Sequence, residues 1–270
     1  MGGRDSDAAR GGRRVVTSHA GLVLRSAAFN LLFVLWSTAF SLTFWPLLVL
    51  PARRIAWLGR WWARGVLVFL ALTVGLRHEV RGLAHRPVGP AIVASKHQSA
   101  WDTIVFFLLH DRLAYVLKAE LLLIPIIGWY LARVGMIAID RRGGARALRS
   151  LIARARRAVA EGRTIVIFPE GTRTAPGTRR PYHPGVAALY AQLDLPVVPV
   201  ALNSGRHWRR RGFLKRPGTI ILEYLPPIPP GLDRETFTAT LETRIEDAVA
   251  RLDKAAVPAD SKEPNRTPAG

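Results

Sequence analysis

The stretch 91-AIVASKHQSAWD-102 begins as an apolar run and ends in polar residues that precede a second apolar segment. The short run Ala91 to Ser95 is typical of a strand buried on both faces, and the residues after Asp102 favour a helix. His97 is thereby predicted where the strand ends, and Asp102 near the helix start. The carboxylate can then accept a hydrogen bond from one imidazole nitrogen, which leaves the other free to take a proton from a hydroxyl. A purely structural pair is the alternative for this spacing.

A second apolar run, Thr164 to Phe168, leads directly into the turn Pro169-Glu170-Gly171-Thr172-Arg173. Gly171 permits close approach of a backbone, Thr172 offers a hydroxyl and an amide, and Arg173 offers a planar fork of donors that suits phosphate. The pattern predicts an anion cradle at the end of a strand. A plain turn with a surface arginine is the alternative.

From His78 onward, short apolar runs alternate with helical patterns. This alternation predicts an α/β fold, with a largely parallel mixed sheet flanked by helices and preceded by an N-terminal helical hairpin. The expected strands are 79–82, 91–95, 114–118, 136–139, 164–168, 197–202 and 219–225. The expected helices are 99–109, 119–134 with a break at Pro125, 144–160, 185–192 and 234–253.

The N-terminal region has no charged residue from Ser26 to Ala52, and a second apolar segment, Ile55 to Leu76, places tryptophans beside arginines. An uncharged run of this length can span a bilayer, and Trp–Arg neighbours suit the headgroup layer. A cleaved signal peptide, a single spanning helix and two buried helices of a soluble core are the alternatives. We favour a helical hairpin with both ends on the cytoplasmic face, because basic residues flank the uncharged run on both sides. These residues are Arg10, Arg13, Arg14, Arg25, Arg53 and Arg54.

The charge balance of the 270-residue chain is strongly basic, with 39 Lys and Arg against 19 Asp and Glu and a net charge of +20. Such a chain expects an anionic partner. Its mean hydropathy of +0.14 disfavours a nucleic-acid binder and favours an anionic membrane or phosphorylated substrates. The absence of cysteine excludes disulfides, thiolate metal sites and a cysteine nucleophile.

Four ordered blocks carry a resemblance to a known family. They are His97 to Asp102 as His-x4-Asp, Gly135 to Arg141, Phe168 to Arg173 as Phe-Pro-Glu-Gly-Thr-Arg, and Val198 to Ala201. In this order and spacing they resemble the glycerolipid acyltransferase family, in particular the 1-acylglycerol-3-phosphate acyltransferases, over roughly residues 79–225. The chain departs from the family at Lys96, where Asn is common, and at 182-YHPG-185, where Phe-Lys-x-Gly is common.

The resemblance implies direct transfer of a fatty acyl group from an acyl thioester to the sn-2 hydroxyl of lysophosphatidic acid. His97 would be the general base and Asp102 its orienting carboxylate. Arg173 and Arg141 would bind the acceptor phosphate. Glu170, Gly171 and Thr172 would shape the acceptor site. Backbone amides near Gly171 could donate to an oxyanion. No metal or cofactor is expected.

The expected partners are a lysophospholipid acceptor, an acyl-CoA or acyl carrier protein donor, and membrane phospholipids, without nucleic acid. The expected location is the cytoplasmic face of the cell inner membrane. Another lysolipid acceptor, such as lyso-ornithine lipid, is the nearest alternative, and a non-catalytic basic membrane- or nucleic-acid-binding protein is another. A late basic cluster could dock headgroups or the donor's carrier, or be a solvated loop. Its members are Arg206, Arg209, Arg210, Arg211, Lys215 and Arg216.

The expected domain organisation follows from these patterns. Residues 1–18 are a disordered basic arm, 19–77 are membrane-associated helices, 78–255 form the α/β acyltransferase domain, and 256–270 are a disordered tail. Lys96 is either a strand-end charge or a contact to an anionic substrate.

Overall fold

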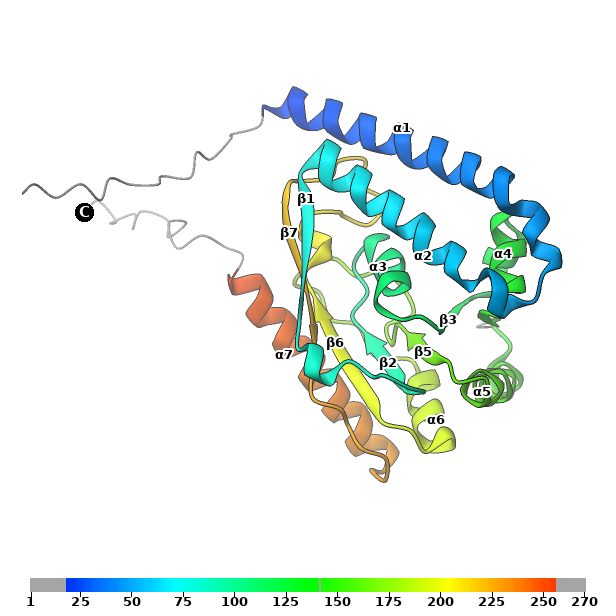
Figure 1. Ribbon diagram of the computed structural model, residues 1–270. Coiled ribbons are helices and arrows are strands. Elements are labelled where there is room, and N and C mark those ends of the chain that lie inside the picture. The colour runs from blue at the N-terminus through cyan, green and yellow to red at the C-terminus, as the bar shows by residue number, and fades with distance from the viewer. Residues whose placement is uncertain (1–17, 141, 256–270) are drawn as a thin grey trace, which may run out of the picture.

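The computed structural model describes residues 18–140 and 142–255. A seven-stranded sheet lies at its centre, with strand order β1-β7-β6-β2-β5-β3-β4 (Figure 1). Residues 1–17 of the expected arm, the expected tail 256–270 and Arg141 lie outside the described residues. The strands are β1 (Leu76–Arg81), β2 (Ile92–Ser95), β3 (Leu113–Lys118), β4 (Ile137–Ile139), β5 (Thr164–Ile167), β6 (Val197–Leu202) and β7 (Gly218–Tyr224).

The sheet is mixed but largely parallel, as the sequence predicted. Strands β6, β2, β5, β3 and β4 run parallel to one another, whereas β7 is antiparallel to β6 and β1 is parallel to β7. All seven expected strands are confirmed. The first begins at Leu76 rather than at Glu79, because Gly75 turns the chain in a left-handed conformation (φ 75°) and Leu76 already pairs with Gly218.

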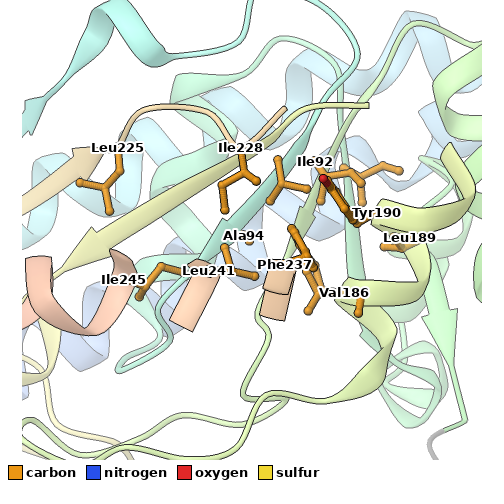
Figure 2. Packing of buried hydrophobic residues seen from close by; sticks show 14 of the residues in the cluster. Ile92, Ala94, Val186, Leu189, Tyr190, Leu225, Ile228, Phe237, Leu241 and Ile245 are labelled. Carbon is orange, nitrogen blue, oxygen red and sulfur yellow. The ribbon is translucent and has the colours of Figure 1, made fainter. Parts of the chain in front are cut away.

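One face of the sheet is covered by α5 (Gly144–Ala160), α6 (Pro184–Leu193) and α7 (Arg234–Ala255). Figure 2 shows this core, in which Ile92 and Ala94 of β2 point toward α6 and α7. Tyr190 and Phe237 stack there with ring centroids 3.8 Å apart. Because side chains alternate along a strand, Val93 of β2 points to the other face.

The second face packs against α3 (Trp101–Leu109) and the N-terminal helices α1 (His19–Phe44) and α2 (Ala52–Phe69). The expected helix over 119–134 is two pieces, a 3-10 turn at Ala119–Leu123 and α4 (Ile127–Arg133), separated at the predicted Pro125 break. Both faces of β2, β5 and β6 are therefore buried, which explains their continuous apolar sequences.

Helices α1 and α2 form a hairpin that lies along the domain (Figure 1). Pro46 and Pro51 end α1 and start α2, because proline lacks the amide that a helix interior requires. The Trp36 indole donates to the carbonyl of Trp62 at 3.1 Å. Both helices are long and apolar enough to cross a membrane, and only 6% of the most apolar window of α1 is buried. The helical pair is confirmed, and its insertion into a membrane stays a prediction.

Candidate active site

The His97–Asp102 pair lies where β2 ends and α3 begins. His97 Nδ1 lies 3.0 Å from Asp102 Oδ2, and the His97 residue is only 9% exposed. Because an ionised carboxylate only accepts hydrogen bonds, this contact assigns the proton of neutral imidazole to Nδ1. Nε2 is then unprotonated and can accept a proton. The structure thus brings His97 and Asp102 together, as their spacing in the sequence predicted, and we call this pair the dyad.

Asp102 is fully buried and surrounded by donors. Its Oδ2 accepts the backbone amides of Gln98 (2.6 Å) and Ser99 (2.8 Å), and its Oδ1 accepts the hydroxyls of Ser99 (3.0 Å) and Ser204. Hydrogen bonds of this kind fix the position of the carboxylate. Ser204 comes from the chain just after β6, so two strand ends build the site.

The backbone of His97 is fixed by the turn after β5. Its amide donates to Glu170 Oε2 (3.1 Å), and its carbonyl accepts the amide (2.8 Å) and hydroxyl (3.1 Å) of Thr174. The imidazole stacks on the Phe168 ring, with centroids 4.0 Å apart and planes 20° from parallel. The ring of His97 is therefore held on one face and at one nitrogen, which leaves Nε2 as its reactive atom.

Lys96 is buried, only 1% exposed, and belongs to a cluster behind the dyad that we call the buried charge cluster: Lys96, Glu170, Tyr182 and Glu246. Lys96 Nζ lies 2.6 Å from Glu170 Oε1 and 2.7 Å from Glu246 Oε1. The Tyr182 hydroxyl donates to the same Glu246 oxygen at 3.2 Å. The idea that Lys96 contacts an anionic substrate is wrong, because its ammonium is enclosed by two carboxylates.

In the buried charge cluster, opposite charges and hydrogen bonds offset the cost of burying each charged group. Burial raises the pKa of Glu170, and the Lys96 ammonium and the His97 amide oppose that rise. Burial and the nearby Glu246 and Glu170 carboxylates raise the pKa of Tyr182, which keeps its phenol protonated as a donor. The cluster therefore holds Glu170 in place under His97.

The predicted anion cradle follows Phe168. Gly171 adopts a left-handed conformation (φ 65°), which favours glycine, and its amide donates to the Phe168 carbonyl at 2.9 Å. That amide is thus used within the turn. Thr172 and Arg173 are half-buried. Burial lowers the pKa of Arg173, and the negative charge of Asp102 opposes this. The next residue, Thr174, donates to the His97 carbonyl, so the turn that carries Arg173 lies beside the dyad.

Three contributing residues escaped the sequence reasoning: Thr174, Ser204 and Glu246. Ser204 follows an expected strand, so the meeting of parallel strand ends is a signal that could have found it. Glu246 is an acid on the apolar side of the helix 234–253, which also signals a buried partner. The block Val198 to Ala201 is buried in β6 and serves as core, as expected.

Comparison with known proteins shows which family this chain is similar to. Residues 77–203 match the family model described as Acyltransferase. The chain is 38% identical over 200 residues to the 1-acyl-sn-glycerol-3-phosphate acyltransferase of Pseudomonas aeruginosa, covering 74% of this chain and 75% of that protein. It is 34% identical over 157 residues to the enzyme of that name from Limnanthes alba, of which it spans about half (55%), with 57% of this chain covered.

A solved structure shares the fold. The crystal structure of the 1-acyl-sn-glycerophosphate (LPA) acyltransferase, PlsC, from Thermotoga maritima superposes with a TM-score of 0.71 at 21% identity, covering 85% of this chain and 97% of that one. The structural likeness shows the shared fold, and the 38% identity to the Pseudomonas aeruginosa enzyme, 75% of which is covered, places the chain in the acyltransferase family. Its particular family is that of the 1-acyl-sn-glycerol-3-phosphate acyltransferases, which the four motifs already resembled.

Proposed function

We propose that this acyltransferase moves a fatty acyl group from an acyl thioester to the sn-2 hydroxyl of lysophosphatidic acid, giving phosphatidic acid. The single observation that carries the proposal is the dyad. His97 Nδ1 lies 3.0 Å from the buried Asp102 carboxylate, which leaves His97 Nε2 as an acceptor for a hydroxyl proton.

The chemistry proceeds by direct transfer. His97 Nε2 takes the proton as the acceptor's hydroxyl oxygen attacks the thioester carbonyl carbon. The new C–O bond gives a tetrahedral intermediate, which collapses as the C–S bond breaks. The departing thiolate receives the proton from the imidazolium, so His97 is regenerated. Asp102 stabilises the imidazolium while it exists.

The turn after β5 supports the acceptor. Arg173 is proposed to bind the acceptor phosphate, since an arginine fork suits phosphate oxygens and its neighbour Thr174 contacts the His97 carbonyl. Thr172 and Gly171 shape the wall of this site, and Glu170 supports it through the His97 amide. Arg141, which the sequence motif adds as a second phosphate ligand, lies outside the described residues.

The location proposed is the cytoplasmic face of the cell inner membrane. The outer faces of α1 and α2 leave large apolar side chains exposed, including Leu31 (60%), Val34 (57%) and Trp61 (58%). A face of this kind suits insertion into lipid. The acceptor would then reach the dyad without leaving the bilayer.

The test uses the full chain purified in detergent with acyl-thioester and lysophosphatidic acid, and measures thiol release. His97→Ala should lower the rate by about 10² to 10⁴, the usual contribution of a general base. His19→Ala is the matched control, because His19 is exposed at the start of α1. Equal rates for wild type and His97→Ala would reject the assigned base.

The acceptor is tested in the same assay. Lysophosphatidic acid should be used faster than lyso-ornithine lipid, which lacks phosphate, and Arg173→Gln should reduce that preference. A preference for lyso-ornithine lipid would reassign the acceptor. If no lysolipid gives thiol release while the protein still binds vesicles, the protein would be assigned as a membrane-binding protein and not as an enzyme.

A further inference from the structure

A second group of arginines lies beside the dyad, in the segment between β6 and β7. We call residues 206–216 the basic loop. Just before it, Ser204 donates to Asp102 and the Gly205 amide donates to the Gln98 side chain at 3.0 Å. Further along, Arg210 Nη1 donates to the carbonyl of Arg173 at 3.4 Å. The basic loop therefore starts at the dyad and returns to the turn that carries Arg173.

The basic loop surrounds a pocket of about 200 Å³. Arg206, Arg209 and Arg216 line it together with His207 and Phe213. The Phe213 side chain is apolar and 52% exposed, so an aromatic surface stands beside the cations. Guanidinium groups next to an exposed ring suit a ligand that has both phosphates and a flat base.

The positive charge of the pocket is poorly neutralised. Arg206 pairs with Asp253 at 3.6 Å, but no carboxylate in residues 18–140 or 142–255 forms an ion pair with Arg209 or Arg216. Burial, together with the charges of Arg206 and Arg216, lowers the pKa of His207. Unpaired cations around a concave surface attract a polyanion.

The pocket is also preorganised, because Lys215 fixes the basic loop to α1. Lys215 is only 4% exposed, so it is not the docking charge that the sequence suggested. Its ammonium binds Asn30 Oδ1 (2.5 Å) and lies 5.1 Å from the centre of the Trp208 ring, while its amide donates to the Ser26 hydroxyl (3.0 Å). A preformed site lowers the entropy cost of binding.

We propose that this pocket binds the phosphorylated nucleotide end of a coenzyme A thioester, the acyl donor. The inference rests on the proposed function, in which both substrates carry phosphate. Arg173 serves the acceptor, so the separate arginines of the basic loop are left for the donor. Arg209 and Arg216 meet the phosphates, Phe213 packs on the adenine, and the thioester arm extends along the loop toward Ser204 and the dyad.

The test variant is Arg209→Gln/Arg216→Gln. The matched control is Arg146→Gln/Arg149→Gln, which removes the same two charges from the exposed side of α5, a helix that packs on β4 and β5 at the far edge of the sheet. In the loop variant the KM for acyl-CoA should rise about tenfold or more, since a lost charged hydrogen bond is of that size. The KM for lysophosphatidic acid and the kinetics of the control should stay within about twofold.

Direct titration of full-length protein with coenzyme A, 3′-dephospho-coenzyme A and adenosine 3′,5′-bisphosphate needs no turnover. Wild type should bind coenzyme A more tightly than the dephospho form, and the loop variant should lose that difference. If the loop variant binds coenzyme A with the same affinity as wild type, the proposed site is rejected even if acyl transfer occurs. If the titration gives the expected difference but the purified protein transfers no acyl group, the proposed function is rejected and the coenzyme A site is retained. A defect with acyl carrier protein alone, or only in binding to anionic vesicles, would overturn coenzyme A as the ligand.

Discussion

Two groups of charge lie close to the dyad and differ in how they are neutralised. The buried charge cluster encloses Lys96, Glu170 and Glu246, none more than 5% exposed, and its ammonium meets two carboxylates within 2.7 Å. The basic loop leaves Arg209, Arg211 and Arg216 exposed, with no carboxylate paired to them among the described residues.

The difference follows from solvation. A buried charge must have a partner, because removal from water costs several kcal/mol per ion. An exposed charge is solvated by water, so it needs no protein partner and is available to bind a ligand. The compensated charges of the buried charge cluster therefore fix the geometry of the dyad, whereas the uncompensated charges of the basic loop are available for binding. Four changes test this contrast, from the largest expected effect to the smallest.

Lys96→Met should have the largest effect on stability. It leaves Glu170 and Glu246 buried without their cation, and the loss of one partner of a buried pair costs about 3–5 kcal/mol. Denaturant unfolding measures the change. Lys254→Met, an exposed lysine on α7, is the control. Adding Glu246→Gln to Lys96→Met should recover part of the loss, and a Lys96→Met variant as stable as the control would contradict the role of compensation.

Glu246→Gln should destabilise the fold by about 1–2 kcal/mol, because a neutral acceptor replaces a charged one opposite Lys96 and Tyr182. Glu246 holds Lys96, and Lys96 pairs with Glu170, which accepts the His97 amide. For this reason kcat should fall several-fold while both KM values stay unchanged. Asp247→Asn is the control, because Asp247 is exposed next to it. A changed KM with normal kcat would count against a positioning role.

Lys215 is the buried charge of the basic loop, and its titration provides a test by pH. Burial lowers its pKa to about 8, against about 10.4 for a free lysine. Between pH 8 and 9.5 the unfolded chain therefore binds more protons than the fold, so stability should rise with pH across this window. After allowance for solvent screening the gain is about 1 kcal/mol. The Lys215→Met variant should show a flat profile, and a decrease in wild-type stability would disprove the assignment.

Arg209→Gln/Arg216→Gln should have the smallest effect on stability without ligand. Removal of mutually repelling exposed cations should change the free energy of unfolding by less than about 0.5 kcal/mol, toward greater stability if at all. Thermal unfolding should then show that coenzyme A raises the Tm of wild type and not that of the variant. A large loss of stability would mean that these arginines are structural after all.

Much of the fold was predictable because its strands are buried on both faces. Runs such as Ile92 to Ser95 are continuous and apolar, and they alternate with helical patterns that cover the sheet. The reversal of β7 relative to β6 was not predictable, since the residues 203–217 between them carry no signal for the direction of return.

The site divides in the same way. The contact between His97 and Asp102 is local, five residues apart, and follows from a strand that leads into a helix. The partners of Lys96 are 74 and 150 residues away, and only the tertiary fold brings them together. For this reason the dyad could be predicted from the sequence, whereas the two buried carboxylate partners of Lys96 could not.

The hairpin has one more consequence. Phe29 of α1 and Val66 of α2 are fully buried in the same core as Val93 and Val166 of the sheet. The apolar helices thus complete the interior of the catalytic domain in addition to any contact with lipid. Removing them to obtain a soluble fragment would strip one face of the sheet and leave an open, aggregation-prone surface. The same two helices thus carry part of the buried core and the exposed apolar side chains that are proposed to face lipid.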